Sequence, residues 1–298
     1  MLTLVAVVTD GLTYAAWIFL VGVGMTLAFG VMKILNVAHG SFYTFGAYVA
    51  ATFVGYWFAA GGAPLASFGL LLLAAAIASL VSGLLLERGL LQFLYGRDEV
   101  VVALATYAAF LMLEDIVPLI WGLEAVSAYQ PYSLLGTVSI GGLTVNLYDM
   151  GLVALATVVA LGSWGILAKT PQGLAVQAVM HDSEGAAASG INVGRVYLYT
   201  FLISAFLGAL AGAATSPMVS VAPGIGVEVV VISFAVVVIG GLGSIPGALV
   251  GAIIVGLCRA IAVNFAPYLE LFAIYGVMTA VLLVRPNGLF AAPQARKI

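Results

Sequence analysis

Four polar residues near the beginning of the chain, Lys33, Asn36, His39 and Ser41, lie between two long apolar runs. Burying polar groups in an apolar environment is costly unless they find hydrogen-bond partners or serve a function. The cluster therefore predicts a helical hairpin that turns at, or helps to line, a polar pathway. Asn36, His39, Gly40 and Ser41 are the candidate pathway residues. A structural alternative, in which Asn36 or Ser41 caps a helix, stays open.

The composition of the whole chain is that of a membrane protein. Of its 298 residues, 64% are hydrophobic and 7% charged, and the mean hydropathy is +1.22. Soluble domains carry roughly 25% charged residues. Because the apolar surplus extends along nearly the whole sequence, we expect one all-α, polytopic transmembrane helical bundle over residues 1–298. The net charge of −3 is small and dispersed, so it does not indicate a nucleic-acid partner.

The apolar pattern predicts eight or nine membrane segments, including short or broken helices. The segment 228–242 would span only about 22 Å at about 1.5 Å per residue, which is short for a crossing. The predicted segments are 11–32, 38–60, 65–86, 100–121, 149–168, 196–217, 228–242, 244–264 and 268–284.

Basic residues orient the chain, because they are retained on the cytoplasmic side of a membrane. With nine crossings and the N-terminus outside, the C-terminus is cytoplasmic and the loop 122–148, which has no basic residue, is external. Only Arg259 then falls near an outer end. The basic residues on the inside are Lys33, Arg88, Arg97, Lys169, Arg195, Arg285, Arg296 and Lys297.

The acidic residues in or near the apolar segments are predicted to lie at the membrane interface. Glu114 and Asp115 are adjacent, towards the outer end of their segment, and Glu228 and Glu270 begin segments at or near the outside. Deep acidic groups would instead suggest proton relay. An ion-coupled secondary transporter therefore remains an alternative.

Several kinds of enzyme and metal site are not indicated. The chain lacks a G-x-x-x-x-G-K-[ST] phosphate loop, and His39 and His181 do not have HExxH spacing. No cysteine pair or acidic run suggests a metal site, and Cys258 is the only cysteine. We therefore expect no metal, no cofactor and no catalytic residue, and any ATP hydrolysis must occur in another subunit.

The segment 169–195 is the longest polar cytoplasmic stretch in this topology. Pro171 and Gly173 are expected to end the preceding helix. A short helix should follow, capped by aspartate and serine and stopped by glycine. Such a helix is suited to docking on a cytoplasmic partner, although a solvated connector is equally compatible. The candidate contact residues are His181, Asp182, Ser183, Glu184 and Gly190.

Small residues at every fourth position predict close helix packing. Gly243, Gly247 and Gly251 form one such stripe, and Gly208 and Gly212 form another. In lipid these stripes let two backbones approach and gain dispersion contacts.

Four stretches of the sequence resemble LivH-type permeases, the membrane subunits of ABC importers for branched-chain amino acids and related small polar solutes. They are GMTLAFGVMKILNVAHGSFYTFGAYVA, QAVMHDSEGAAASGINVGR, VVVIGGLGSIPGALVGA and VRPNGLF, in the expected order. The stretch Asn36–Gly40 favours the LivH-like partner over the LivM-like one, which is similar to S-L-G-H near this point. Lys33 stands where arginine is common in the family, and Val37 where phenylalanine is common.

The resemblance implies a multi-pass subunit of a bacterial inner-membrane importer. It implies a homologous LivM-like permease as partner, with the pathway between the two, and two cytoplasmic ATPase subunits docked on 169–195. It also implies an extracytoplasmic solute-binding protein at the outer face. Branched-chain amino acids are the expected substrate, with urea, amides, other amino acids and aromatic acids open. A sugar permease of the more distant ribose type is a further alternative.

Overall fold

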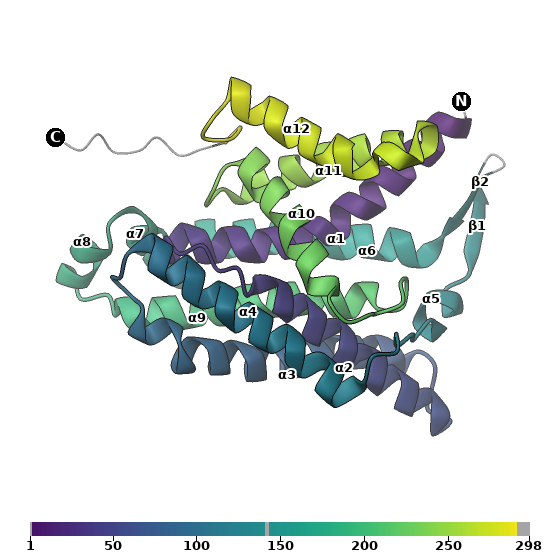
Figure 1. Cartoon of the computed structure of the whole chain (residues 1–298), viewed down its shortest axis with the longest axis horizontal. Helices are drawn as coiled ribbons and strands as arrows, with labels where there is room; N and C mark the ends of the chain where they lie inside the picture. Colours follow the sequence, from purple (N-terminus) through teal and green to yellow (C-terminus); the bar gives the residue numbers. More distant parts are fainter. Residues whose placement is uncertain (1, 141–142, 291–298) are drawn as a thin grey trace.

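The computed structural model describes residues 2–140 and 143–290, and most of them belong to helices (Figure 1). The α-helices are α1 (Leu2–Met32), α2 (His39–Ala59), α3 (Ala66–Gly89), α4 (Glu99–Trp121), α5 (Gln130–Leu134), α6 (Leu147–Lys169), α7 (Pro171–His181), α8 (Ser183–Ala188), α9 (Val193–Thr215), α10 (Ile225–Gly240), α11 (Ile245–Phe265) and α12 (Glu270–Val284). Two 3-10 turns, η1 (Leu91–Phe93) and η2 (Pro267–Leu269), precede α4 and α12. Strands β1 (Thr137–Ile140) and β2 (Leu143–Asn146) pair antiparallel.

The predicted fold class is confirmed. Among the described residues, seven helices are long and apolar enough to cross a membrane. The two other predicted segments correspond to α2, which has 21 residues, and to α10, which has 16. At about 1.5 Å per residue, α10 is about 24 Å long, so the expectation of a short helix here was correct. The first helix begins at Leu2 rather than at residue 11, and Asp10 lies within it.

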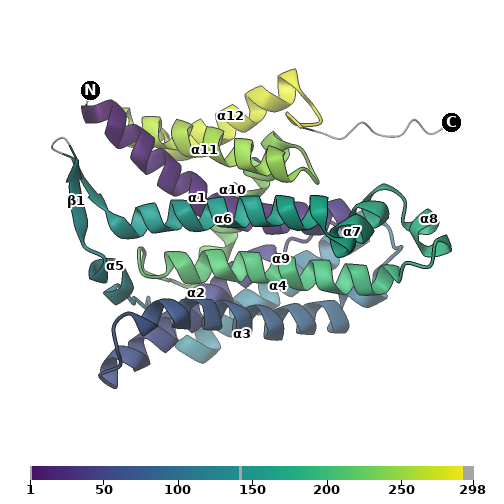
Figure 2. The same cartoon turned by 180° about the vertical axis from the view of Figure 1, so that it is seen from behind.

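Helix α1 is the centre of the bundle. Its residues Ile18, Phe19, Leu20 and Val21 are completely buried. Figure 1 shows α2, α3 and α4 on one side of α1, and α11 and α12 on the other. Figure 2 shows α6 and α9 across the back, and α10 crosses obliquely between the two groups (Figure 1).

Polar side chains begin several of the long helices. Each cap accepts a hydrogen bond from a backbone N–H of the first turn, which has no partner within the helix. The caps are Asp98 for α4, Asn146 for α6, Asn192 for α9 and Ser244 for α11. These local sequence signals explain why the helices start where they do.

The two ends of the bundle differ in charge. We call them the hairpin end, which carries β1 and β2 and the beginning of α1, and the α8 end, which carries α7 and α8 (Figures 1 and 2). Eight basic residues were predicted to lie on the cytoplasmic side. Six of them are described, and each lies at or next to a helix end at the α8 end: Lys33, Arg88, Arg97, Lys169, Arg195 and Arg285. Arg296 and Lys297 lie outside the described residues.

Two connecting segments differ from the prediction. The preceding helix α6 ends at Lys169, close to Pro171 as predicted, but Pro171 also begins a second helix, α7, which was not predicted. The Thr170 hydroxyl caps this new helix by accepting a hydrogen bond from the Gly173 N–H, at 3.0 Å. Proline is well suited to a first turn, where its missing N–H has no helical partner. The loop 122–148, which was predicted to be external, contains α5 and the β-hairpin, neither of which the apolar pattern predicted.

Of the predicted stripe Gly243, Gly247 and Gly251, only the last two lie on one helix. Gly247 and Gly251 lie on α11 and pack against the backbone of Gly240 and Val236 on α10. Gly243 precedes α11, with φ +83°, and packs against Gly30 of α1, so placing it on the same helix was wrong. The chain must turn here with a positive φ, which favours glycine.

Candidate functional site

The break between α1 and α2 is the first part of the site. Lys33 ends α1 with a left-handed backbone, φ 54°, and the chain then runs back alongside the bundle. His39, the first residue of α2, lies beside Val21, which is eleven residues before the end of α1. That separation is about 16 Å along the helix axis. Helix α2 therefore begins deep inside the bundle rather than at its surface.

The connecting segment 33–38 has no regular secondary structure, so side-chain hydrogen bonds fix its conformation. The Asn36 Oδ1 accepts a hydrogen bond from the Ala38 N–H at 3.1 Å. The Thr106 hydroxyl of α4 lies 3.3 Å from the Val37 nitrogen and 3.4 Å from the Leu35 oxygen. The Nδ2 of Asn36 is buried and has no partner among the described residues. Asn36 therefore shapes the turn into α2, but it does not cap the helix as the structural alternative expected, because the N-cap residue is Ala38 and no side chain caps the first turn.

His39 fills a space within the bundle. Its ring is completely buried, its Nε2 lies 3.1 Å from the Val21 carbonyl, and its Nδ1 lies 3.5 Å from the Ser204 hydroxyl of α9. Gly24 and Gly208 make room for the ring, since a side chain at either position would press against it. His39 thus joins α1, α2 and α9, and its role in solute passage remains a prediction.

Glu114 is the main polar residue that sequence reasoning placed wrongly. It is 9% exposed, and its Oε1 accepts hydrogen bonds from the hydroxyls of Thr44, at 2.8 Å, and Ser41, at 3.5 Å. Its carboxylate also contacts Gly226 in the first turn of α10. Glu114 is therefore not an interfacial residue. The sequence did place this carboxylate inside an apolar run, which is a sign of a buried group, but no local pattern identified its hydrogen-bond partners.

Gly40 and Gly226 allow α2 and α10 to meet at this carboxylate. A side chain on Gly40 would collide with the carbonyl oxygen of Gly226, and one on Gly226 would collide with Glu114. The first turns of both helices thus lie at one buried carboxyl group, a position where a negative charge would be favoured by the positive end of a helix dipole. Asn36, His39, Gly40 and Ser41 are all buried, and none of them lines the acidic cavity described below.

The other end of α10 is capped by residues far away in the sequence. The N–H groups of Leu289 and Phe290 donate to the carbonyls of Ile239 and Gly240, both at 2.9 Å. These carbonyls belong to the last turn of α10, which lacks helical partners. Gly288, with φ +83°, packs directly on Gly241. The R-P-N-G-L-F motif therefore closes the short helix, which the sequence alone did not indicate.

The segment 169–195 projects from the α8 end (Figure 1). The Asp182 Oδ1 accepts hydrogen bonds from the N–H groups of Glu184, at 3.1 Å, and Gly185, at 3.0 Å, so the predicted cap is present. Gly190, with φ +86°, follows the end of α8. His181, Asp182 and Glu184 are exposed and Ser183 is half-buried. The structure thus presents a short capped helix to the solvent, which agrees with the local prediction.

A cavity of about 560 Å³ lies at the hairpin end, where α1, α2, α6, α9, α10, α11 and α12 all contribute lining residues. We call it the acidic cavity. Its charged and phenolic lining residues include Asp10 and Tyr14 of α1, Asp149 of α6, Glu228 of α10, Arg259 of α11 and Glu270 of α12.

Among the described residues, one of these carboxylates, that of Glu270, has a basic partner. The Nε and Nη2 of Arg259 both lie 2.7 Å from Oε1 of Glu270, and the guanidinium stacks 4.1 Å from the centre of the Tyr14 ring. Tyr132 of α5 donates to Asp149 at 3.4 Å. Burial, and then the nearby charge of Asp149, raise the pKa of the Tyr132 phenol, so it remains a neutral donor.

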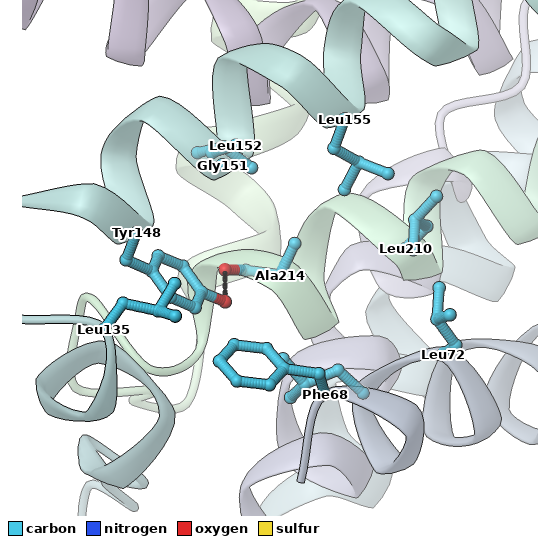
Figure 3. A pocket seen from close by; sticks show the side chains of 10 residues that line it. Phe68, Leu72, Leu135, Tyr148, Gly151, Leu152, Leu155, Leu210 and Ala214 are labelled. Atoms are coloured by element: carbon cyan, nitrogen blue, oxygen red, sulfur yellow. Dashed lines mark hydrogen bonds between the residues drawn. The ribbon is translucent and has the colours of Figure 1, made fainter. Parts of the chain in front are cut away.

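A second cavity, of about 250 Å³, is apolar (Figure 3). It lies between α3, α6 and α9, with Leu72, Leu155 and Leu210 among its lining residues. Figure 3 shows Tyr148 beside Phe68, with its hydroxyl bonded to the Ala214 carbonyl at 2.7 Å. The phenol oxygen is thereby occupied, and the remaining lining offers no charged group to a solute.

Comparison with known proteins decides the family. A family model described as branched-chain amino acid transport system, permease component, matches residues 7–284. The chain belongs to this family. The resemblance recognised from four stretches of the sequence is therefore confirmed over almost the entire permease.

Two relatives cover nearly all of the permease. BraD of Pseudomonas aeruginosa, a high-affinity branched-chain amino acid transport system permease protein, is 27% identical over 298 residues, with 97% of this chain and 96% of BraD covered. LivH of Escherichia coli K12, which has the same description, is 27% identical over 304 residues, with 98% and 95% covered. The ribose import permease RbsC of Haemophilus influenzae is 30% identical over 160 residues, 51% of this chain and 46% of RbsC. No solved structure matches the chain.

Each of the four motifs of the permease includes a helix break or end. The first contains the turn between α1 and α2, and the second contains α8 with its cap. The third contains the turn between α10 and α11, and the last closes α10 from a distance. Backbone groups in a membrane must be satisfied within the protein wherever a helix stops. These motifs therefore lie where the fold depends most on particular residues.

Proposed function

We propose that this permease is one membrane-spanning subunit of an ATP-driven ABC importer. Together with a homologous LivM-like permease it forms the pathway for branched-chain amino acids or a related small polar solute. The family match over residues 7–284, with relatives named as branched-chain amino acid permeases, is the observation that supports this function most. The lipid bilayer surrounds the bundle.

In this proposal the α8 end is cytoplasmic and the N-terminus lies outside a bacterial inner membrane. The separation of basic residues between the two ends of the bundle supports this orientation. A single cysteine at Ser189 or Ser133, each in a Cys258→Ala background, tests it in intact cells. An impermeant thiol reagent should label Ser133→Cys, at the hairpin end, and not Ser189→Cys. The opposite labelling pattern would refute the orientation.

The whole chain acts as one permease domain, in which 169–195 is the coupling loop. Two cytoplasmic ATPase subunits dock on this loop, and an extracytoplasmic binding protein delivers solute to the hairpin end. The exposed, capped α8 supports this assignment, because an ordered helix transmits force better than a flexible linker. Helix α7 ties it to the bundle, with Gly173 packed on the end of α6.

The coupling role is tested by reversing a charge on α8. Glu184→Lys should weaken co-purification of the ATPase subunits and lower ATP hydrolysis stimulated by loaded binding protein in proteoliposomes. Glu124→Lys, an exposed charge reversal in the loop after α4 at the opposite end of the bundle, is the matched control for co-purification and should leave it unchanged. A Gly-Ser replacement of 182–188 should uncouple hydrolysis from uptake. Unchanged assembly and stimulation in both loop variants would show that coupling occurs elsewhere.

The two alternatives make different demands on partners. An ion-coupled secondary transporter would take up solute as an isolated protein in vesicles with a proton or sodium gradient. A sugar permease, suggested by partial similarities such as that to RbsC, would receive its solute from a sugar-binding protein. Calorimetry of the neighbouring binding protein with amino acids and sugars distinguishes the substrate classes.

A further inference from the structure

The lining of the acidic cavity has an excess of negative charge. Four carboxylates face one guanidinium, which leaves three formal negative charges without a counter-charge. The ion pairs among the described residues are Arg88–Glu87 and Arg259–Glu270, so Asp10, Asp149 and Glu228 have no basic partner there. Charges of one sign in a cleft with low-dielectric walls focus the field and concentrate ions of opposite sign.

One of these carboxylates also has unsatisfied hydrogen-bonding capacity. The Asp149 Oδ1 is buried and has no partner among the described residues, while Oδ2 accepts the bond from Tyr132. Asp10 of α1 lies close enough to Asp149 for their charges to interact. Two neighbouring carboxylates repel each other unless a cation or proton lies between them. The geometry therefore favours a ligand with a positive, hydrogen-donating group.

The remaining lining suits the rest of a small organic molecule. Trp17 and Tyr14 pack edge to face at 5.0 Å, and Trp17 lies 6.0 Å from Tyr43. Their rings line the cavity together with Met218 and Val229. The volume, about 560 Å³, is within the range of roughly 300–1,000 Å³ that is usual for small-molecule sites. Aromatic faces also attract ammonium groups.

Arg259, the basic residue among the described residues that line the cavity, is not free to receive an anion. Arg259 is bonded through two nitrogens to Glu270 and stacks on Tyr14. A solute carboxylate would have to compete with Glu270 for it. The cavity thus discriminates by charge, in favour of the ammonium end of a solute.

We propose that the acidic cavity binds the ammonium group of an amino-acid solute, with Asp10, Asp149 and Glu228 as its counter-charges, and disfavours anionic solutes. This inference rests on the proposed function, because it assigns the site to the transported solute. It places a charge selection within this permease, in addition to any selection by a binding protein.

The test measures how a cysteine in the cavity reacts with charged reagents. Thr13 lines the cavity, so Thr13→Cys in a Cys258→Ala background gives a single thiol there. The purified complex is treated with a trimethylammonium methanethiosulfonate and with a sulfonate methanethiosulfonate of similar size. Relative to a free thiol, the cationic reagent should be preferred by about tenfold or more.

Neutralising two of the carboxylates should weaken this preference. Asp10→Asn with Glu228→Gln should lower the ratio severalfold, whereas Asp115→Asn with Glu99→Gln, two exposed acidic residues of α4, should leave it unchanged. A ratio equal to that of a free thiol, or equal ratios in the two double variants, would overturn the proposal.

Solute protection tests for ammonium binding itself. L-Leucine and isoamylamine, at up to millimolar concentrations, should slow the labelling of Thr13→Cys, and 4-methylpentanoate, which has no ammonium group, should not. Protection by 4-methylpentanoate equal to that by isoamylamine, or no protection by any of the three, would overturn the proposal. Because labelling needs neither ATP nor binding protein, its failure leaves the importer function intact. Failure of that function would instead appear as absent ATPase stimulation.

Discussion

Replacing Glu114 tests whether one buried carboxylate joins the first turns of α2 and α10. Its Oε1 accepts hydrogen bonds from Thr44 at 2.8 Å and from Ser41 at 3.5 Å, and the carboxylate contacts Gly226. The informative changes are Glu114→Ala, which removes all of these contacts, and Glu114→Gln, which keeps an acceptor oxygen but removes the charge.

The expected loss of stability can be estimated from the contacts that Glu114 makes. A hydrogen bond to a charged acceptor contributes about 1.5–3 kcal/mol, and the Thr44 bond has the distance of a full one. The Ser41 bond is at the limit of hydrogen-bond length and contributes less. A negative charge near a helix N-terminus adds about 0.3–1 kcal/mol. We therefore expect Glu114→Ala to lower the free energy of unfolding by about 3 kcal/mol, and Glu114→Gln by about 1 kcal/mol.

The assay is unfolding of the purified permease in detergent micelles by titration with a denaturing detergent. Asp115→Asn is the matched control, because this neighbouring carboxylate is exposed and should change stability by less than about 0.5 kcal/mol. If Glu114→Ala is no more destabilising than Asp115→Asn, Glu114 does not hold the two helices together. If Glu114→Gln is as damaging as Glu114→Ala, the charge matters rather than the hydrogen bonds.

Three backbone positions allow simpler tests by the same unfolding assay. Gly212→Ala should cost about 1–3 kcal/mol, because its methyl group would overlap the backbone of α2, whereas Gly55→Ala, in open space, should be neutral or stabilising. Gly288→Ala should cost roughly 2–4 kcal/mol through its positive φ and its contact with α10, and Gly276→Ala is its unhindered control. Lys33→Gly should stabilise the protein by about 0.5–1 kcal/mol by relieving a left-handed backbone, and a loss of stability would show that the lysine side chain is needed.

The features that could be predicted from the sequence are those that depend on neighbouring residues. Apolar runs of about 20 residues gave the membrane segments, and the run at 228–242 indicated a short helix, which is α10. The cap at Asp182 and the stop at Gly190 were also predictable, because both depend on residues within one turn. Local signals of this kind act in the same way in any fold.

The features that were missed depend on contacts between distant segments. Glu114 was placed at the interface because its position within α4 says nothing about Thr44, seventy residues earlier in the chain. The depth at which α2 begins is fixed by the contact of His39 with Val21, which hydropathy does not encode. Gly243 fitted a helical spacing, but the required positive φ placed it in a turn.

The α7–α8 segment and α10 are connected by a continuous series of contacts, which gives the proposed coupling a physical route. Met180 of α7 packs over Gly30 of α1, and Gly30 contacts Gly243 in the turn after α10. Met180, Gly243 and Phe290 also line one cavity of about 350 Å³ at the α8 end, so this junction has room to rearrange. At its other end α10 carries Glu228, which lines the acidic cavity. Because α10 is held at both ends by residues of other segments, a displacement of α7 would move a rigid helix rather than deform a flexible one. The same short helix would thus link ATPase docking at one end of the permease to solute binding at the other.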